Sequence, residues 1–297
     1  MRHKTWLSPI LLIFLALIWG YNWIVMKKAL GSVGPFTFAT LRMLLGSAAL
    51  FIVMFIKKQP LKLKYPGKTI LLGFFQTTAF TGLSMWALVA GGAGNVAMLV
   101  YTMPFWVMVL AWPLLNEKLN IIQVSSAIIA ILGLGCFFLP SSGAGTLESK
   151  FLALVSGFTW AISVIIGKKI QTDEHTSVLS ITAWQMLLGG LMLALILPFV
   201  HERSLLATPY FWFALIYNVG PSTALGWLTW LYLLRKMKAG TASLGLLLAP
   251  IFGLITAGWE LHEIPSPINL LGIFAILTAL SIISVYNIRY LSATIQE

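Results

Sequence analysis

The chain has 297 residues, of which 59% are hydrophobic and only 9% are charged, and its formal net charge is +11. A soluble domain carries about 25% charged residues because it needs a polar surface, so this composition excludes an ordinary soluble enzyme and indicates an integral membrane protein. The basic excess fits either nucleic-acid binding or the basic cytoplasmic loops of a membrane protein.

Apolar segments follow one another along the whole chain. A helix of about 20 residues crosses a hydrocarbon core of about 30 Å. The breaks between segments hold glycines, prolines and charged residues, which are typical of turns. The sequence therefore predicts an all-α integral membrane protein with ten transmembrane helices, at residues 7–26, 36–56, 69–90, 94–115, 121–139, 150–170, 176–199, 210–234, 240–260 and 267–288.

The lysines and arginines gather in alternate loops of this arrangement. With the N-terminus in the cytoplasm, 14 of the 19 basic residues lie on the cytoplasmic side, 4 lie outside, and Arg42 lies within a helix. Such an excess marks the cytoplasmic side of membrane proteins. The distribution predicts that both termini are cytoplasmic, and it explains the net charge without nucleic acid as a partner.

The second half of the chain is a diverged copy of the first. A tryptophan precedes a lysine by eight positions in both, at Trp19–Lys27 and at Trp160–Lys168, with an offset of 141 residues. Two longer matches have offsets of 143 and 146 residues: RMLLG with QMLLG (42–46, 185–189) and AGNVAMLVYTMP with AGTASLGLLLAP (93–104, 239–250).

Each copy contains five predicted helices, which is an odd number, so the second copy enters the membrane upside down. We therefore expect two inverted five-helix repeats, at residues 1–143 and 144–297. Inverted repeats are the architecture of many secondary transporters, whose substrate site lies near the midplane where the repeats meet. Gene duplication without transport is the alternative explanation.

The motifs resemble the drug/metabolite transporter superfamily, EamA type. The resemblance rests on Trp-Gly-x-Asn-x-x-x-x-Lys from Trp19 to Lys27, on the helix of Arg42, and on Gly-Asn-x-Ala…Pro from Gly94 to Pro104. It covers nearly the whole chain. It implies a secondary transporter of the bacterial inner (plasma) membrane that exports metabolites, amino acids or drugs by alternating access. Its partners would be a small-molecule substrate and the lipid bilayer, the chain would be a monomer or weak homo-oligomer, and no cofactor or metal is expected.

Polar and aromatic side chains inside the apolar segments predict the substrate pathway. Such residues usually face a cavity or a packed interface. Aromatic rings offer flat apolar surface, and amides and hydroxyls offer donors and acceptors. The alternatives are helix packing for the small polar residues and an interfacial belt for the tryptophans. The predicted pathway residues are Trp19, Asn22, Trp23, Gln76, Tyr101, Trp160, Ser163, Asn218 and Arg42.

Arg42 is a lone cation within an apolar segment, and its counterpart in the second copy is Gln185. A buried cation is costly unless it meets water, backbone carbonyls or an anion. Arg42 therefore either binds a substrate carboxylate or extends to the outer surface or a helix end.

Pro104 and Pro250 occupy matched positions in the two copies. A proline removes a backbone hydrogen bond and tends to kink its helix. The pair predicts either matched hinges or two static bends.

The sequence also limits the chemistry. No Asp, Glu or His lies in the middle of a predicted helix, so no group for proton coupling is visible. His262–Glu263 begins a zinc-protease motif, but Ser266 stands where the second histidine would be, and an intramembrane enzyme is not expected.

A carrier of phosphorylated sugars would need several basic residues in its cavity. Amino acids with aromatic or apolar side chains are the favoured substrates, with hydrophobic or cationic drugs as the alternative.

Overall fold

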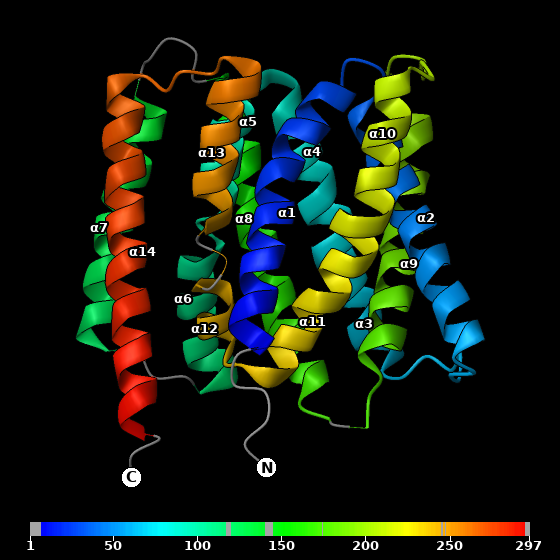
Figure 1. Cartoon of the computed structure of the whole chain (residues 1–297), viewed down its shortest axis with the longest axis horizontal. Helices are drawn as coiled ribbons and strands as arrows, with labels where there is room; N and C mark the ends of the chain where they lie inside the picture. The colour runs from blue at the N-terminus through cyan, green and yellow to red at the C-terminus, as the bar shows by residue number, and fades with distance from the viewer. Residues whose placement is uncertain are drawn as a thin grey trace.

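The computed structural model describes residues 7–116, 120–139, 145–173, 175–244, 246 and 248–294. Every regular element in these ranges is a helix (Figure 1). The elements are α1 (Leu7–Ala29), α2 (Pro35–Ile56), α3 (Pro66–Leu72), η1 (Gly73–Ala79), α4 (Phe80–Ala90), α5 (Ala93–Val100), α6 (Met103–Leu115), α7 (Ile121–Phe138), α8 (Leu147–Gln171), α9 (Val178–Ile196), η2 (Leu197–Phe199), α10 (Pro209–Tyr217), η3 (Asn218–Leu225), α11 (Gly226–Lys236), α12 (Ala239–Leu244), α13 (Leu248–Leu261) and α14 (Pro267–Thr294).

The helices stand side by side, and their ends lie at two opposite edges of the molecule (Figure 1). Within the described ranges, six helical segments are long and apolar enough to cross a membrane, and three apolar helices are shorter. The six are Leu7–Ala29, Pro35–Ile56, Pro66–Ala90, Ala93–Leu115, Leu147–Gln171 and Val178–Phe199, and the three are Val124–Phe138, Leu248–Leu261 and Pro267–Ala279. The chain is thus an all-α, multi-pass membrane protein.

Local signals explain where several helices begin. Prolines such as Pro35 and Pro209 occupy the first turn, where their missing N–H costs no hydrogen bond. The hydroxyls of Ser177 and Thr208 accept hydrogen bonds from backbone N–H groups three residues later. These residues fix the starts of α2, α9 and α10.

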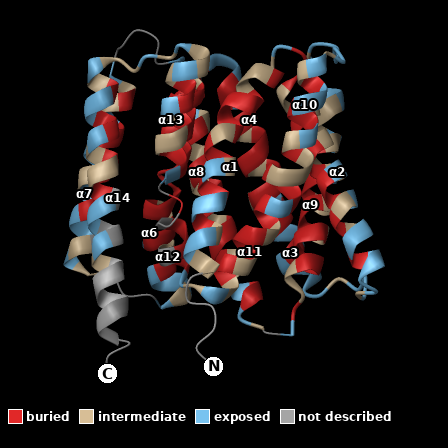
Figure 2. Ribbon diagram, viewed as in Figure 1, coloured by how far each residue is buried: buried red, intermediate tan, exposed pale blue. Residues whose placement is uncertain are grey.

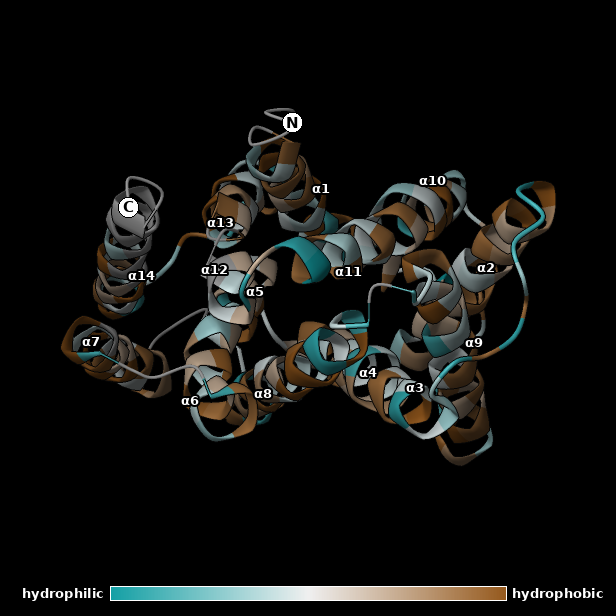
Figure 3. Ribbon diagram, turned by 90° about the horizontal axis from the view of Figure 1, so that it is seen from below, coloured by the Kyte–Doolittle hydropathy of each residue, from teal (hydrophilic) through white to brown (hydrophobic). Residues whose placement is uncertain are grey.

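The buried side chains concentrate where the central helices α1, α4, α8 and α11 meet (Figure 2). Large apolar residues remain exposed on the outer faces, for example Phe55 at 79% and Trp259 at 78%. An apolar exterior suits contact with lipid. Seen from below, the helices are largely hydrophobic, and the loop that follows α2 is among the hydrophilic segments (Figure 3).

Helices α7 and α14 pack against each other at one edge of the molecule (Figures 1 and 3). Their contact depends on two glycines. A Cβ atom on Gly272 would lie 2.6 Å from the carbonyl oxygen of Gly133, which is closer than real Cβ contacts. Small residues let helix backbones approach closely in membranes.

Two lysines at matched positions cap neighbouring helices. Lys27, near the end of α1, donates to the carbonyl of Leu88 near the end of α4, at 2.7 Å. Lys168, near the end of α8, donates to the carbonyl of Leu234 in α11, at 2.8 Å. A cation is favourable at a helix C-terminus because the last carbonyls there have no partner within the helix. The lysine of the repeated Trp–Lys motif therefore makes the same kind of contact in both halves of the chain.

Two π-helical segments also occupy matched positions. Segment η1 separates α3 from α4, and η3 separates α10 from α11. They end at Ala79 and Leu225, which are 146 residues apart (225 − 79). π-Helical turns inside α-helices are rare and often occur at functional sites.

The predicted helices at 94–115 and 240–260 are broken, which corrects the expectation of two kinked helices. Helix α5 ends at Val100 and α6 begins at Met103, whereas α12 ends at Leu244 and α13 begins at Leu248. The physical reason is that Pro104 and Pro250 follow these breaks closely and cannot donate a hydrogen bond to the preceding turn. Whether these breaks act as hinges stays a prediction.

The other predicted helix ranges agree with the structure to within a few residues. The largest differences are the longer α14, which ends at Thr294, the later end of α1 at Ala29, and the earlier starts of α3 and α8. The boundary predicted between residues 143 and 144, and the chain termini at 1–6 and 295–297, lie outside the described residues. Below, "first half" means the described residues up to 139 and "second half" those from 145.

Candidate functional site

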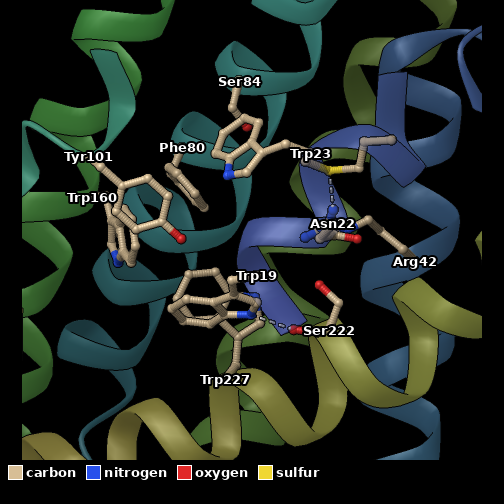
Figure 4. Close-up of a pocket in the computed structure, with 11 residues that line it drawn as sticks. Trp19, Asn22, Trp23, Arg42, Phe80, Ser84, Tyr101, Trp160, Ser222 and Trp227 are labelled. Atoms are coloured by element: carbon tan, nitrogen blue, oxygen red, sulfur yellow. Dashed lines mark hydrogen bonds between the residues drawn. The ribbon is translucent and has the colours of Figure 1, made fainter. Parts of the chain in front are cut away.

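A small cavity lies in the interior, between helices of both halves (Figure 4). Its volume is about 30 Å³, which is room for one or two water molecules and far too little for an amino acid. The conformation is therefore closed around this site. The lining residues are Trp19, Asn22, Trp23 and Met26 of α1, Arg42 of α2, Phe80 and Ser84 of α4, Tyr101 between α5 and α6, Trp160 of α8, Ser222 of η3 and Trp227 of α11.

Aromatic rings from four helices form one wall of the cavity. The ring centroid of Trp19 lies 4.8 Å from that of Trp227 and 5.6 Å from that of Trp160. The Trp160 ring in turn lies 4.9 Å from Phe80 and 5.6 Å from Tyr101. Tilted and edge-to-face pairs at such separations are favourable beyond the apolar area that they bury. The cluster forms an apolar wall of tilted and edge-to-face rings.

The indole N–H groups of this cluster are not equivalent. Trp19 Nε1 donates to the backbone carbonyl of Ser222 in η3, at 2.9 Å. Trp160 Nε1 and Trp227 Nε1 are buried, and neither has a hydrogen-bond partner among the described residues. An unpaired buried donor costs roughly 1–3 kcal/mol, so a group that supplied an acceptor would be stabilised here.

Arg42 lies at the opposite side of the cavity and is only 4% exposed. Its Nη1 donates to Asn218 Oδ1 of η3 at 2.8 Å and also contacts the sulfur of Met26. Asn218 is itself fixed, because its Nδ2 donates to the carbonyl of Ala214 at 2.9 Å. The expectation that Arg42 extends to the outer surface is wrong, since the guanidinium is buried and held toward the cavity.

The structure brings most of the predicted pathway residues together. Gln76 and Ser163 do not line the cavity: Gln76 is fully buried in η1, and Ser163 donates to the carbonyl of Trp160. Asn218 lies behind Arg42 as its hydrogen-bond partner. That any of these residues contacts a substrate stays a prediction. The six of the nine that line the cavity are Trp19, Asn22, Trp23, Arg42, Tyr101 and Trp160.

Five lining residues are not among the predicted pathway residues: Met26, Phe80, Ser84, Ser222 and Trp227. Phe80 and Ser84 follow Gln76 at intervals of four, so a helix-face search starting from Gln76 would have found both. Trp227 has no aromatic counterpart 146 residues earlier, where Thr81 stands, so the repeat gave no signal for it.

A wider vestibule, of about 600 Å³, opens at the edge of the molecule that carries the loop after α2. It shares helices α1 and α11 with the cavity: Leu11 lines the vestibule and Trp19 the cavity, about 12 Å further along α1. Its lining includes Lys57 and Arg235 but, among the described residues, no Asp or Glu. The vestibule is therefore a basic hollow that lies on the same two helices as the aromatic cavity.

The two halves also contact each other at the opposite edge. The carboxylate of Glu202 accepts hydrogen bonds from the backbone N–H groups of Phe36 and Thr37, at 2.6 and 2.9 Å. A carboxylate is favourable there because the first N–H groups of α2 are otherwise unpaired. Lys28 and Glu260 add an ion pair at 2.5 Å.

Other contacts between the halves lie at the vestibule edge. Tyr65 donates to the carboxylate of Asp173 at 2.8 Å, and Lys64 lies 3.5 Å from it. Hydrogen bonds from Thr176, from Tyr65 and from the backbone N–H of His175 lower the pKa of the Asp173 carboxyl well below its ordinary value. The two halves are thus joined at both edges around a closed cavity.

Comparison with known proteins gives consistent results. The chain is 27% identical over 259 residues to the uncharacterized transporter YoaV of Bacillus subtilis, covering 85% of this chain and 88% of that protein. It is 28% identical over 299 residues to a probable amino-acid metabolite efflux pump of Salmonella typhimurium, covering 94% and 95%. It is 26% identical over 298 residues to an Escherichia coli protein of the same name, covering 96% of both.

A solved crystal structure shares the fold. It overlays with a TM-score of 0.71 at 16% identity and covers 95% of this chain and 98% of that one. The model of the EamA-like transporter family matches residues 6–139 and 149–285, which together are most of the sequence. The chain therefore belongs to the EamA-like transporter family, within the drug/metabolite transporter superfamily.

Proposed function

We propose that the protein is a secondary transporter of a bacterial inner membrane that exports small metabolites by alternating access around the aromatic cavity. The observation that carries the proposal is the cavity itself. It is built from both halves of the chain, is too small to hold an amino acid, and joins an aromatic wall to a buried arginine. A site where the two halves meet is the arrangement that an alternating-access cycle uses.

The favoured substrates are amino acids with aromatic or apolar side chains. The Trp19, Trp160 and Trp227 rings would contact the apolar side chain, and Arg42 would bind the carboxylate. The name of the Salmonella and Escherichia relatives, probable amino-acid metabolite efflux pump, is in line with this class. Cationic drugs are less favoured because Arg42 would repel them.

Inverted five-helix repeats at 1–143 and 144–297 complete the proposal. Helices α1 and α8, which carry the matched Trp–Lys motifs, run in opposite directions between the two edges (Figure 1). The matched π-helical segments, the matched helix breaks and the two lysine caps also support it. In this arrangement the vestibule edge is cytoplasmic.

Transport by the purified protein in liposomes tests the proposal. Labelled phenylalanine, tryptophan and leucine should equilibrate faster than in protein-free liposomes. Trp160→Ala should lower the initial rate about tenfold or more, a loss of about 1.4 kcal/mol, because it removes part of the aromatic wall. Trp212→Ala is the matched control, since Trp212 is 52% exposed on the outer face. Equal rates for both variants would contradict the assignment of the cavity.

A further inference from the structure

The charges around the transport route are of one sign. Arg42 is the cation of the cavity, and none of the described lining residues is acidic. Arg42 also takes part in no ion pair among the described residues, because its Nη1 contacts only a neutral amide and a thioether. Its Nε is buried and has no hydrogen-bond partner in the described part of the chain.

A buried cation with no counter-ion is costly, and a bound anion offsets that cost. The planar guanidinium binds carboxylates with two parallel hydrogen bonds and is therefore suited to this class of anion. The aromatic wall, with its unpaired Trp160 and Trp227 N–H groups, faces the same small volume. The site as a whole thus matches a ligand with an aromatic ring and one negative charge.

A zwitterion fits this charge distribution less well. Its carboxylate would bind Arg42, but its ammonium group would find no carboxylate among the described lining residues. Asn22 Oδ1 and Ser222 Oγ, both buried and unpaired among the described residues, and the ring faces are neutral acceptors that would replace a carboxylate. A ligand with a hydroxyl or carbonyl in place of the ammonium avoids this loss.

The vestibule carries the same sign. Lys57 and Arg235 line it, whereas Asp173, which accepts hydrogen bonds from the lining residues His175 and Thr176, is paired with Lys64. A cleft lined by one sign of charge raises the local concentration of oppositely charged ligands. Anions would therefore be enriched at the entrance before they reach Arg42.

We propose that this carrier selects its substrates by net charge and prefers aromatic monoanions, such as aromatic 2-hydroxy and 2-oxo acids, over zwitterionic amino acids with the same ring. The proposal rests on the proposed function, because it assumes that transport passes through the aromatic cavity. Arg42 sets the preference, and the vestibule lysine and arginine assist the entry of the anion.

Three probes that share a phenyl ring test the preference. They are 3-phenyllactate with one negative charge, phenylalanine as a zwitterion, and trimethyl(2-phenylethyl)ammonium with one positive charge. Uptake into liposomes that contain the full-length protein is measured for each, and protein-free liposomes correct for passive diffusion. The expected order is phenyllactate, phenylalanine, then the cation, with about tenfold between the first two, which corresponds to about 1.4 kcal/mol.

Variants at Arg42 and Lys57 distinguish an effect of charge on substrate preference from a loss of folded protein. Arg42→Gln introduces the residue of the matched position Gln185, and it should abolish the preference for phenyllactate. Arg42→Lys keeps the charge and should keep the order of the probes with weaker binding. Lys57→Gln, an exposed substitution, should slow phenyllactate uptake more than phenylalanine uptake at low salt, and the difference should disappear at high salt because salt screens such attraction.

The outcomes distinguish the two proposals. Phenylalanine uptake equal to or faster than phenyllactate uptake would overturn selection by net charge and leave amino-acid export intact. An unchanged preference in a folded Arg42→Gln variant would also overturn it. If the wild-type protein moves none of the probes and none of the labelled amino acids, the proposed function itself fails.

Discussion

At the scale of single residues, the two matched tryptophans of the cavity differ in the hydrogen bonding of their indole N–H groups. Trp19 donates to the carbonyl of Ser222, whereas Trp160 Nε1 has no partner among the described residues. Gln76 stands 146 residues before Ser222, so its carbonyl would be the matched acceptor for Trp160 (222 − 76). Inverted repeats in a transporter adopt different conformations at any moment and exchange them during the cycle. An exchange of the indole hydrogen bond between the halves would accompany that step.

We predict that Trp19→Phe destabilises the closed conformation more than Trp160→Phe does. Both variants lose some packing, but only the first leaves a carbonyl without its donor, which costs roughly 1–3 kcal/mol when buried. Thermal unfolding of the purified variants in detergent would measure the difference. A Trp160→Phe variant that is equally or more destabilised would show that the Trp19–Ser222 hydrogen bond contributes nothing particular.

Sequence reasoning located much of this site because polar and aromatic residues inside apolar segments are informative. It selected Trp19, Asn22 and Arg42, each of which lines the cavity. It could not find the pairing of Arg42 with Asn218, which depends on how α2 and η3 approach each other. Gln76 is an error of a different kind. It was predicted to line the pathway, but a polar residue within a helix can equally be buried by packing, as Gln76 is in η1.

At the scale of elements, helix ends in this protein are stabilised by side chains from neighbouring elements. Lys27 and Lys168 each reach the C-terminal carbonyls of another helix, and Glu202 reaches the N-terminus of α2. Unpaired backbone groups are expensive near lipid. These contacts fix the positions of helices relative to one another.

The Lys168 cap can be tested against its neighbour. Lys168→Met should lower the free energy of unfolding by about 1.5–3 kcal/mol, the range for hydrogen bonds that involve a charged group, because it removes the donor to Leu234 and Met237. Lys169→Met is the control, since Lys169 is exposed. Denaturation of both variants in detergent compares them. Equal stability of the two variants would refute the capping role.

The positions of the helices were predictable from hydropathy, but their internal irregularities were not. An apolar run shows the same pattern whether it is continuous or broken, so the break after Val100 and the π-helical segments left no periodic signal. Pro104 indicated an irregularity, yet a proline alone does not distinguish a bend inside a helix from a new helix start.

The break before Pro104 gives a further prediction. Pro104→Ala restores a backbone N–H and favours a continuous helix through Tyr101. If the break must flex during transport, the variant should fold normally and turn over several-fold more slowly. Pro113→Ala is the control, because Pro113 lies on an exposed part of the same α6. Liposome uptake rates measure both, and equal rates would make the break a static feature.

At the scale of the whole molecule, the distribution of basic residues predicts the orientation. The loop that contains Lys62 lies at the vestibule edge, and the loop that contains Ser204 lies at the opposite edge (Figure 1). Most lysines and arginines fall on the vestibule side when the chain is threaded through the ten proposed crossings. The basic vestibule would then receive substrate from the cytoplasm, as export requires.

Cysteine labelling tests this orientation. In a Cys136→Ala background, Lys62→Cys and Ser204→Cys each place one thiol at an exposed loop position. An impermeant thiol reagent applied to intact cells should label residue 204, and residue 62 only after the membrane is permeabilised. Labelling of 62 and not 204 in intact cells would reverse the orientation. The vestibule would then open to the outside, and its positive charge would favour the uptake of anions. The same measurement therefore also tests the direction of transport that the charges imply.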